Sequence, residues 1–307
     1  MNENNTMTPI AKVQIGINPL TWTNDDLPSL GADTPLEVCL SEARQAGYSG
    51  IELGNKFPRE ASVLGPILQQ HDISLVSGWY SARLLERSVE DEIEAMQDHL
   101  NLLRALGSSV MVVAEVSGCI HGDQSAPLSQ RPRMTEAQWV EYAARMTQLA
   151  DYMAGEGVKM AYHHHMGTVI ETEAEVDKLM AMTGDNVGLL LDTGHITFAG
   201  GDALAVAKKH AQRIKHVHCK DIRPGVLKDN LNRDSAFLNA VLEGVYTVPG
   251  DGSIDYLPIF EVLKTVNYSG WIVVEAEQDP AIANPLTYAK MGYEYLSSNL
   301  TKAGFAF

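Results

Sequence analysis

Eight short apolar runs, separated by segments with helical patterns, constrain the fold of this chain more than any other feature. Thr34, Pro35 and Glu37 predict a helix start with Thr34 as its N-cap. Thr172 and Glu175 form a second capping signal. Strands that alternate with helices form parallel sheets, so eight such units in 307 residues predict an α/β fold, the (β/α)8 TIM barrel. The expected strands are residues 13–18, 49–53, 73–77, 109–114, 158–162, 187–191, 214–218 and 271–275.

An open, doubly wound sheet is the alternative fold. Its first strand–helix turn usually carries a glycine-rich phosphate-binding pattern, which this chain lacks. No shift in composition marks a second domain, so we expect residues 11–307 to form a single TIM-barrel domain after a flexible N-terminal tail, residues 1–10. Two long loops, residues 115–133 and 222–255, are expected to cover the mouth of the barrel or to form a subunit contact in a homo-oligomer.

The charge balance excludes some partners. The chain has 23 Lys and Arg residues against 39 Asp and Glu residues, a net charge of −16. Nucleic-acid affinity comes largely from basic side chains on phosphates, so we expect no nucleic-acid partner. No apolar run approaches the ~20 residues that span a bilayer, so we expect no membrane partner. The three cysteines are widely spaced and odd in number, which does not suggest a disulfide framework. The first residues lack the basic and apolar regions of a signal peptide, so we expect a cytoplasmic location.

The strongest functional signal is the stretch Val187–Gly200, in which an apolar run ends directly in Asp192, Gly194 and His195. Either Asp192 only caps the next turn, or the pair belongs to a site. In a barrel the carboxyl ends of all eight strands surround one mouth, where TIM-barrel sites are built. Other expected strands end in similar groups: Glu52; His163, His164 and His165; His216, His218, Lys220 and Asp221; and Glu275, Glu277 and Asp279.

Four neighbouring strands that end in imidazole or carboxylate groups favour a divalent metal over a metal-free acidic pocket. Asp192 and Glu275 would repel each other at one mouth, and a cation between them would remove that repulsion. A mixed set of His, Asp and Glu suits Mn²⁺, Co²⁺, Zn²⁺ or Fe²⁺. A metal bound to a carbohydrate carbonyl makes the neighbouring C–H acidic, and a carboxylate, His or Lys can then move the proton. This chemistry serves epimerases, ketose isomerases and dehydratases alike.

Three strand ends, LLLDTGHI, HVHCKD and WIVVEAEQDP, resemble those of the xylose-isomerase-like TIM-barrel superfamily. The segments GINPLTWTNDD, IELGNKFPR and YHHHMGTVIET extend the resemblance to the inosose dehydratase family within it, over nearly the whole chain. The resemblance implies a carbon–oxygen lyase of myo-inositol catabolism that uses Mn²⁺ or Co²⁺. Its implied substrate is a small keto-cyclitol, 2-keto-myo-inositol, which loses water to give a trihydroxycyclohexane-1,2-dione. The resemblance also associates glutathione with the activity.

The resemblance also implies a set of metal ligands. By position, Asp192, His218 and Glu275 match three ligands of the superfamily. The fourth is usually a Glu that ends the fifth strand, where this chain has His163 instead. Glu171 is a more distant candidate for the fourth ligand.

The remaining polar strand ends are candidates for proton transfer and substrate binding. The candidates for proton transfer are His195, Lys220 and Asp221. The side chains expected to shape the substrate pocket are Trp22, Asn24, Glu52 and Glu277. The alternative interpretation of Trp22 is packing alone, and that of Glu52 is an ion pair with an Arg.

Three other functions are considered for such a barrel. A metal-dependent ketose epimerase or isomerase shares the ligands and differs in its product. A sugar-binding sensor keeps the fold without turnover, but this sequence carries no appended DNA-binding or interaction domain. A DNA-repair endonuclease of the same superfamily needs a basic groove, which the acidic balance disfavours.

Overall fold

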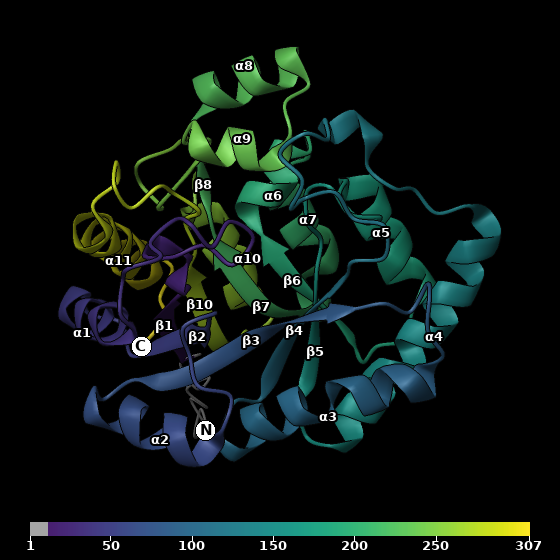
Figure 1. Cartoon of the computed structure of the whole chain (residues 1–307), viewed down its shortest axis with the longest axis horizontal. Helices are drawn as coiled ribbons and strands as arrows, with labels where there is room; N and C mark the ends of the chain where they lie inside the picture. Colours follow the sequence, from purple (N-terminus) through teal and green to yellow (C-terminus); the bar gives the residue numbers. More distant parts are fainter. Residues whose placement is uncertain (1–11) are drawn as a thin grey trace, which may run out of the picture.

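Eight parallel strands close into a barrel in the order β1-β10-β7-β6-β5-β4-β3-β2 (Figure 1). The computed structural model describes residues 12–307, so the tail expected at residues 1–10 lies outside the described residues. The closed parallel barrel confirms the predicted fold, and each strand except β3 lies within one residue of its expected bounds. The barrel strands are β1 (Val13–Ile17), β2 (Gly50–Leu53), β3 (Ser74–Ala82), β4 (Val110–Glu115), β5 (Lys159–His163), β6 (Val187–Asp192), β7 (Ile214–Cys219) and β10 (Gly270–Val274).

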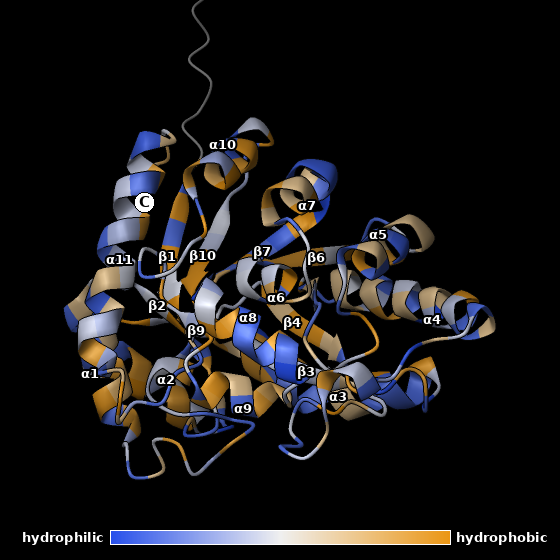
Figure 2. Ribbon diagram, turned by 90° about the horizontal axis from the view of Figure 1, so that it is seen from above, coloured by the Kyte–Doolittle hydropathy of each residue, from blue (hydrophilic) through white to orange (hydrophobic). Residues whose placement is uncertain are grey.

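Eight helices form the outer layer, and their apolar faces turn toward the strands (Figure 2). They are α1 (Leu36–Ala46), α2 (Ala61–Gln70), α3 (Val89–Ala105), α4 (Glu136–Gly155), α5 (Glu173–Met182), α7 (Ala203–His210), α10 (Leu257–Thr265) and α11 (Pro285–Lys302). The main core lies between strands and helices, as burial of the amphipathic faces requires. Within residues 12–307, no helix is long and apolar enough to cross a membrane.

The two predicted helix starts have different outcomes. Thr172 and Glu175 form the predicted capping box at α5. The prediction for α1 is wrong: the helix begins after Pro35, which is its N-cap and offers no side-chain hydrogen bond. Thr34 instead closes a turn, because its N–H donates to the carbonyl of Gly31 at 2.9 Å. Pro35 then stays in the extended conformation, and the helix starts one residue later than a Thr34 cap would allow.

The expected loop at residues 222–255 is in large part a folded unit. It holds two short helices, α8 (Pro224–Arg233) and α9 (Phe237–Leu242), which lie beyond the helical ring at the top of Figure 1. A two-stranded antiparallel sheet, β8 (Asp221–Ile222) with β9 (Tyr246–Thr247), ties the unit to the end of β7. Its apolar side chains, Phe237 and Tyr246 among them, form a second small core together with Met166 and Phe198. The expected loop at residues 115–133 has little regular structure apart from a 3-10 turn, Leu128–Gln130.

Candidate metal centre and cavity

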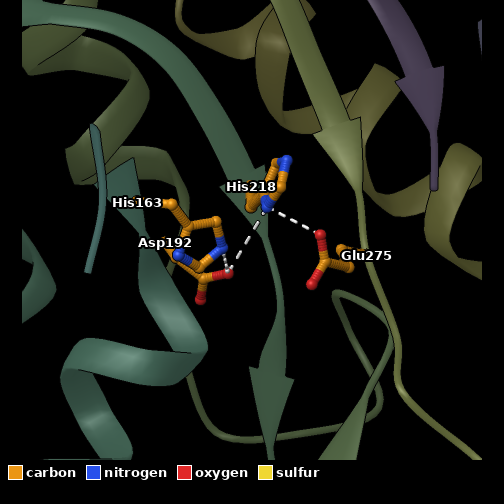
Figure 3. A group of neighbouring side chains, drawn as sticks. All are labelled: His163, Asp192, His218 and Glu275. Carbon is orange, nitrogen blue, oxygen red and sulfur yellow. Dashed lines mark ion pairs between the residues drawn. The ribbon is translucent and has the colours of Figure 1, made fainter. Parts of the chain in front are cut away.

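Four polar side chains meet at the carboxyl ends of four neighbouring strands (Figure 3). His163 ends β5, Asp192 ends β6, His218 lies near the end of β7, and Glu275 directly follows β10. The strand register sets this meeting, because Asp192 is the direct partner of His218 across β6 and β7. One ligand atom from each of the four lies within 4.8 Å of the others. The structure thus brings together the four residues that the sequence analysis named as metal ligands.

Each of the two imidazoles turns one ring nitrogen to this cluster. His163 Nδ1 lies 2.7 Å from the carbonyl oxygen of His164, so it donates its proton there and leaves Nε2 free. His218 Nε2 lies 3.1 Å from a carboxylate oxygen of Glu52, which leaves His218 Nδ1 for the cluster. His163 Nε2 and His218 Nδ1 lie 3.5 Å and 3.6 Å from the same oxygen of Asp192. Those separations are close to the ~3.4 Å between neighbouring ligands of a tetrahedral metal with bonds of ~2.1 Å.

The carboxylate of Asp192 caps the next helix and also faces the cluster, the two alternatives that the sequence left open for this residue. Its Oδ1 accepts a hydrogen bond from the backbone N–H of His195 and caps the short helix α6 (Thr193–Phe198). Its Oδ2 is fully buried, faces both imidazoles and has no hydrogen-bond partner among residues 12–307. A buried carboxylate oxygen without a donor is costly unless a cation completes it. This orphaned oxygen, with two imidazoles and a second carboxylate around it, fits a divalent metal.

Lys220 brings a fixed positive charge beside the cluster. Its ammonium nitrogen lies 2.6 Å from Glu275 Oε1, 2.8 Å from Glu277 Oε2 and 3.0 Å from His195 Nε2, one acceptor for each of its three protons. Burial opposes this charge, but Glu275, Glu277 and Asp192 outweigh burial and raise the pKa of Lys220 above its usual value. Lys220 is therefore a protonated donor here and not a free base.

His195 lies behind Lys220, outside the cavity described below. Its Nε2 lies 3.0 Å from the Lys220 ammonium, while its Nδ1 accepts the backbone N–H of Met166 at 3.3 Å and lies 3.1 Å from the hydroxyl of Tyr246. Burial, the neighbouring His165 and Lys220 together hold the pKa of His195 well below its usual value. His195 is thus a neutral ring that fixes Lys220.

A cavity of about 90 Å³ opens beside the cluster. Glu277 and His165 line it together with His163, His218 and Glu275 of the metal cluster. Burial raises the pKa of Glu277 to about 7, although Lys220 pulls in the opposite direction. His165 donates its Nδ1 proton to the carbonyl of Met166 at 2.8 Å, which leaves Nε2 as an acceptor. The complete lining is Asn18, Leu20, Asp25, Asp26, Glu52, Leu53, Trp79, Val112, His163, His165, His218, Glu275 and Glu277.

Besides Asp192, His195 and Lys220, three further residues that the sequence placed in the site do not line this cavity. Asp221 faces the opposite way, and its carboxylate accepts backbone N–H groups of Gly250, Ser253 and Ile254. Asp221 lies just after β7, close in sequence to the site residues His218 and Lys220. Its hydrogen bonds nevertheless hold the loop that follows β9 and do not reach the cavity.

Trp22 and Asn24 were expected to shape the substrate pocket, and neither lines the cavity. Trp22 is buried in the main core and donates its indole N–H to Glu42 at 2.6 Å. Asn24 accepts the N–H groups of Asp26 and Leu27, so it shapes the loop that brings Asp26 to the cavity. Both act on the site only through the loop after β1.

Glu171 stands apart from the metal cluster. Its carboxylate pairs with Arg131 at 3.2 Å and accepts the N–H of Gly167 at 2.7 Å. It fastens the loop after β5 to Arg131 and is not among the grouped ligand atoms.

Several cavity residues carried no signal that sequence reasoning used. Asn18 ends the first expected strand, where the same rule that selected Glu52 would have found it. Trp79 lies in β3, which extends to Ala82, well past the expected end at residue 77. Asp25 and Asp26 come from a loop and reach the cavity only through its folding.

Relatives of known name match almost the whole chain. The "Rhizopine catabolism protein MocC" of Rhizobium meliloti is 53% identical over 296 residues, which cover 96% of this chain and 91% of that protein. The "Inosose dehydratase" of Geobacillus thermodenitrificans is 45% identical over 287 residues, covering 93% of this chain and 96% of that protein.

The fold has relatives among solved structures as well. One is described as the IOLI protein with a binding zinc atom. It has a TM-score of 0.69 at 18% identity, and the match covers 96% of this chain and all of that one. Residues 40–298 match the family described as Xylose isomerase-like TIM barrel. The chain belongs to that family, and the inosose dehydratases and MocC are among its relatives there.

Proposed function

We propose that this protein is a metal-dependent hydro-lyase that removes water from 2-keto-myo-inositol and so acts as an inosose dehydratase. The observation that carries the proposal is the buried four-residue cluster with its orphaned Asp192 oxygen beside a small cavity. Relatives named inosose dehydratase, 45% identical over 93% of the chain, supply the reaction class. Most side chains that line the cavity are polar or charged, as the hydroxyl groups of a cyclitol require.

His163, Asp192, His218 and Glu275 would hold the metal, for which we propose Mn²⁺ or Co²⁺. When bound, the metal would supply Lewis acidity toward a ketone oxygen and stabilise negative charge that develops there. Two imidazole nitrogens and two carboxylates are a donor set that suits either ion. We assign no residue of the cavity to glutathione, and activity with and without glutathione tests whether it takes part.

Loss of water from an α-hydroxy ketone ring requires a base for the α-proton and an acid for the leaving hydroxyl. Glu277 and His165 are titratable side chains that line the cavity beside the metal cluster, and we assign the two transfers to them. Lys220 keeps its charge beside Glu277 and holds that carboxylate in place at 2.8 Å. His195 in turn contacts the ammonium group of Lys220, so it would affect the reaction only indirectly, through Lys220.

The test is mass spectrometry of 2-keto-myo-inositol after incubation with Mn²⁺-loaded protein. A product lighter by one water supports the dehydratase. An isomer of unchanged mass would show that the protein is an epimerase or isomerase. Binding of 2-keto-myo-inositol without turnover would support a sugar-binding sensor. Chelator-treated protein, restored by added Mn²⁺, is the control for the metal.

Solvent deuterium separates the two proton transfers. Glu277→Gln and His165→Asn should both abolish dehydration. The variant that still exchanges the α-proton with D₂O retains the base, so the altered residue is the acid. If both variants dehydrate at the wild-type rate, our assignment of the two transfers is wrong.

The higher identity to MocC favours a second candidate, a substrate within rhizopine catabolism. The two relatives differ in name but share almost the whole chain, so the same barrel and the same cluster would serve either substrate. Turnover of rhizopine, measured beside turnover of 2-keto-myo-inositol by the same protein, decides between them.

A further inference from the structure

Glu52 lies at the carboxyl end of β2, across the barrel from β7, and all of its hydrogen-bonding capacity is used by the protein. Asn18 Nδ2 and Ser77 Oγ each lie 2.6 Å from its carboxylate oxygens. His216 Nε2 lies 2.8 Å from one oxygen, and His218 Nε2 lies 3.1 Å from the other. A carboxylate offers about four lone-pair positions, so these four donors leave none for a substrate hydroxyl.

The direction of these bonds matters for the metal cluster. His218 can carry a proton on Nε2 and keep a lone pair on Nδ1 only if an acceptor lies beyond Nε2, and Glu52 is that acceptor. His218 Nδ1 then faces Asp192 and Glu275, the two carboxylates of the cluster. Without Glu52 the ring could turn or carry its proton on the other nitrogen.

His216 completes the arrangement without joining the cluster. It precedes His218 by two residues on β7, so both rings point to the same side of the strand. Its Nε2 donates to the same carboxylate, and its Nδ1 has no hydrogen-bond partner within residues 12–307. The four grouped ligand atoms do not include it. His216 therefore helps to hold Glu52 in place by contacting Oε1, whereas Asn18 contacts Oε2.

We propose that Glu52 is a positioning residue for the metal: it sets the tautomer and ring orientation of His218 and does not bind substrate. Asn18 couples this carboxylate to the cluster, because its Nδ2 also lies 3.2 Å from Glu275. The proposal rests on the metal site of the proposed function, although it does not depend on which substrate the protein uses. Loss of such an outer carboxylate costs about 10- to 100-fold in metal affinity.

The experiment measures Co²⁺ binding to metal-free protein by calorimetry and by the visible absorption of the bound ion. Glu52→Gln keeps the size of the side chain but places an amide against imidazole donors. Glu52→Asp keeps the charge but is one methylene too short to hold His218. Both should weaken Co²⁺ binding by about 10- to 100-fold and change the Co²⁺ spectrum at saturation. Use of two variants keeps the test open if either one fails to fold.

Glu115→Gln is the matched control. Glu115 is a buried Glu near the carboxyl end of β4, and it accepts backbone N–H groups of Leu84 and Ser117 without contact to the cluster. This control should retain wild-type Co²⁺ affinity and spectrum. At saturating metal, the KM of the Glu52 variants for substrate should stay at the wild-type value.

The outcomes separate this inference from the proposed function. If the wild-type protein binds no divalent metal, the proposed function fails. If the wild type binds Co²⁺ and both Glu52 variants bind it equally well, only the positioning role is wrong. A raised KM with wild-type Co²⁺ affinity would make Glu52 a substrate ligand instead and would overturn the inference.

Discussion

At the scale of single residues, the site depends on carboxylates whose two oxygens have different partners. Asp192 caps a helix with one oxygen and faces the cluster with the other. Glu275 gives one oxygen to Lys220 and turns the other to His218. The sequence analysis treated the cap and the site as competing explanations for Asp192, and the structure shows that one side chain can serve both.

Asp192→Asn separates those two roles. Asn is as good an N-cap as Asp, so α6 should remain intact while the anionic ligand is lost. We expect metal binding to fall below detection with little change in the thermal midpoint of the metal-free protein. Asp192→Ala should lose the metal and, in addition, about 1 kcal/mol of stability. Calorimetric metal titration and thermal unfolding of both variants check this. Equal metal affinity in the wild type and Asp192→Asn would remove Asp192 from the ligands.

The raised pKa of the buried Glu115 carboxyl predicts that the stability of the protein depends on pH. Burial raises its pKa in the folded protein to about 7, from an ordinary value near 4.5. The folded state therefore holds this proton more tightly than the unfolded chain, and stability falls as pH rises from about 4.5 through 7. In Glu115→Gln that part of the fall should be absent, so the variant should gain stability relative to the wild type between pH 5 and pH 8. Urea unfolding of both proteins at pH 5 and pH 8 measures it. A constant difference between them at the two pH values would contradict the prediction.

At the scale of elements, close approach between α6 and β7 creates the position of Lys220. Gly194 lies inside α6 and is not among the glycines with positive φ. Its lack of a side chain matters for packing instead. A Cβ there would lie 2.6 Å from Cγ and 2.8 Å from Cδ of Lys220.

Gly194→Ala tests this packing. The added methyl should push Lys220 away from Glu275 and Glu277, because Lys220 is fully buried and has no free space to accept it. We expect a loss of about 1–3 kcal/mol from overpacking, with a large fall in kcat. Gly225→Ala is the control, since a Cβ at Gly225 would meet nothing within 4 Å. Wild-type stability and kcat in Gly194→Ala would show that Lys220 can move freely.

At the scale of the whole molecule, the folded unit at residues 222–255 packs against the site from outside the barrel. The ring of Phe237 on α9 lies 5.1 Å from that of His165 and 5.7 Å from that of His195, measured between centroids. Tyr246 on β9 contacts both His195 and Lys220. The helices α8 and α9 thus support the imidazoles through one aromatic cluster, and the unit belongs to the architecture of the site.

Metal binding should stabilise the whole fold, because the cluster joins β5, β6, β7 and the end of β10. A ligand that binds only the folded state at 100 times its Kd adds about 2.7 kcal/mol. We therefore expect Mn²⁺ or Co²⁺ to raise the thermal midpoint by several degrees and a chelator to reverse the shift. Asp192→Asn should show no shift with either ion. An equal shift in the wild type and this variant would place the stabilising metal elsewhere.

The sequence by itself determined the barrel, because strand and helix periodicities are local properties that eight repeats make unambiguous. It also determined which strand ends carry imidazoles and carboxylates, and the four candidate ligands do meet. Only the tertiary structure decided the direction of each side chain beyond the strand ends. Asp221 and Lys220 are neighbours in sequence, yet Asp221 turns to the backbone of residues 250–254 and Lys220 turns to the cluster.

The same reason explains the part of Glu52. Its four donors come from β1, β3 and β7, and no local pattern of β2 could indicate them. The folded unit over the site was missed because short helices and two-residue strands have weak local signals and form by packing on Phe237 and Tyr246. Local chemistry chose the elements, and long-range contacts between them decided which polar groups face the metal cluster.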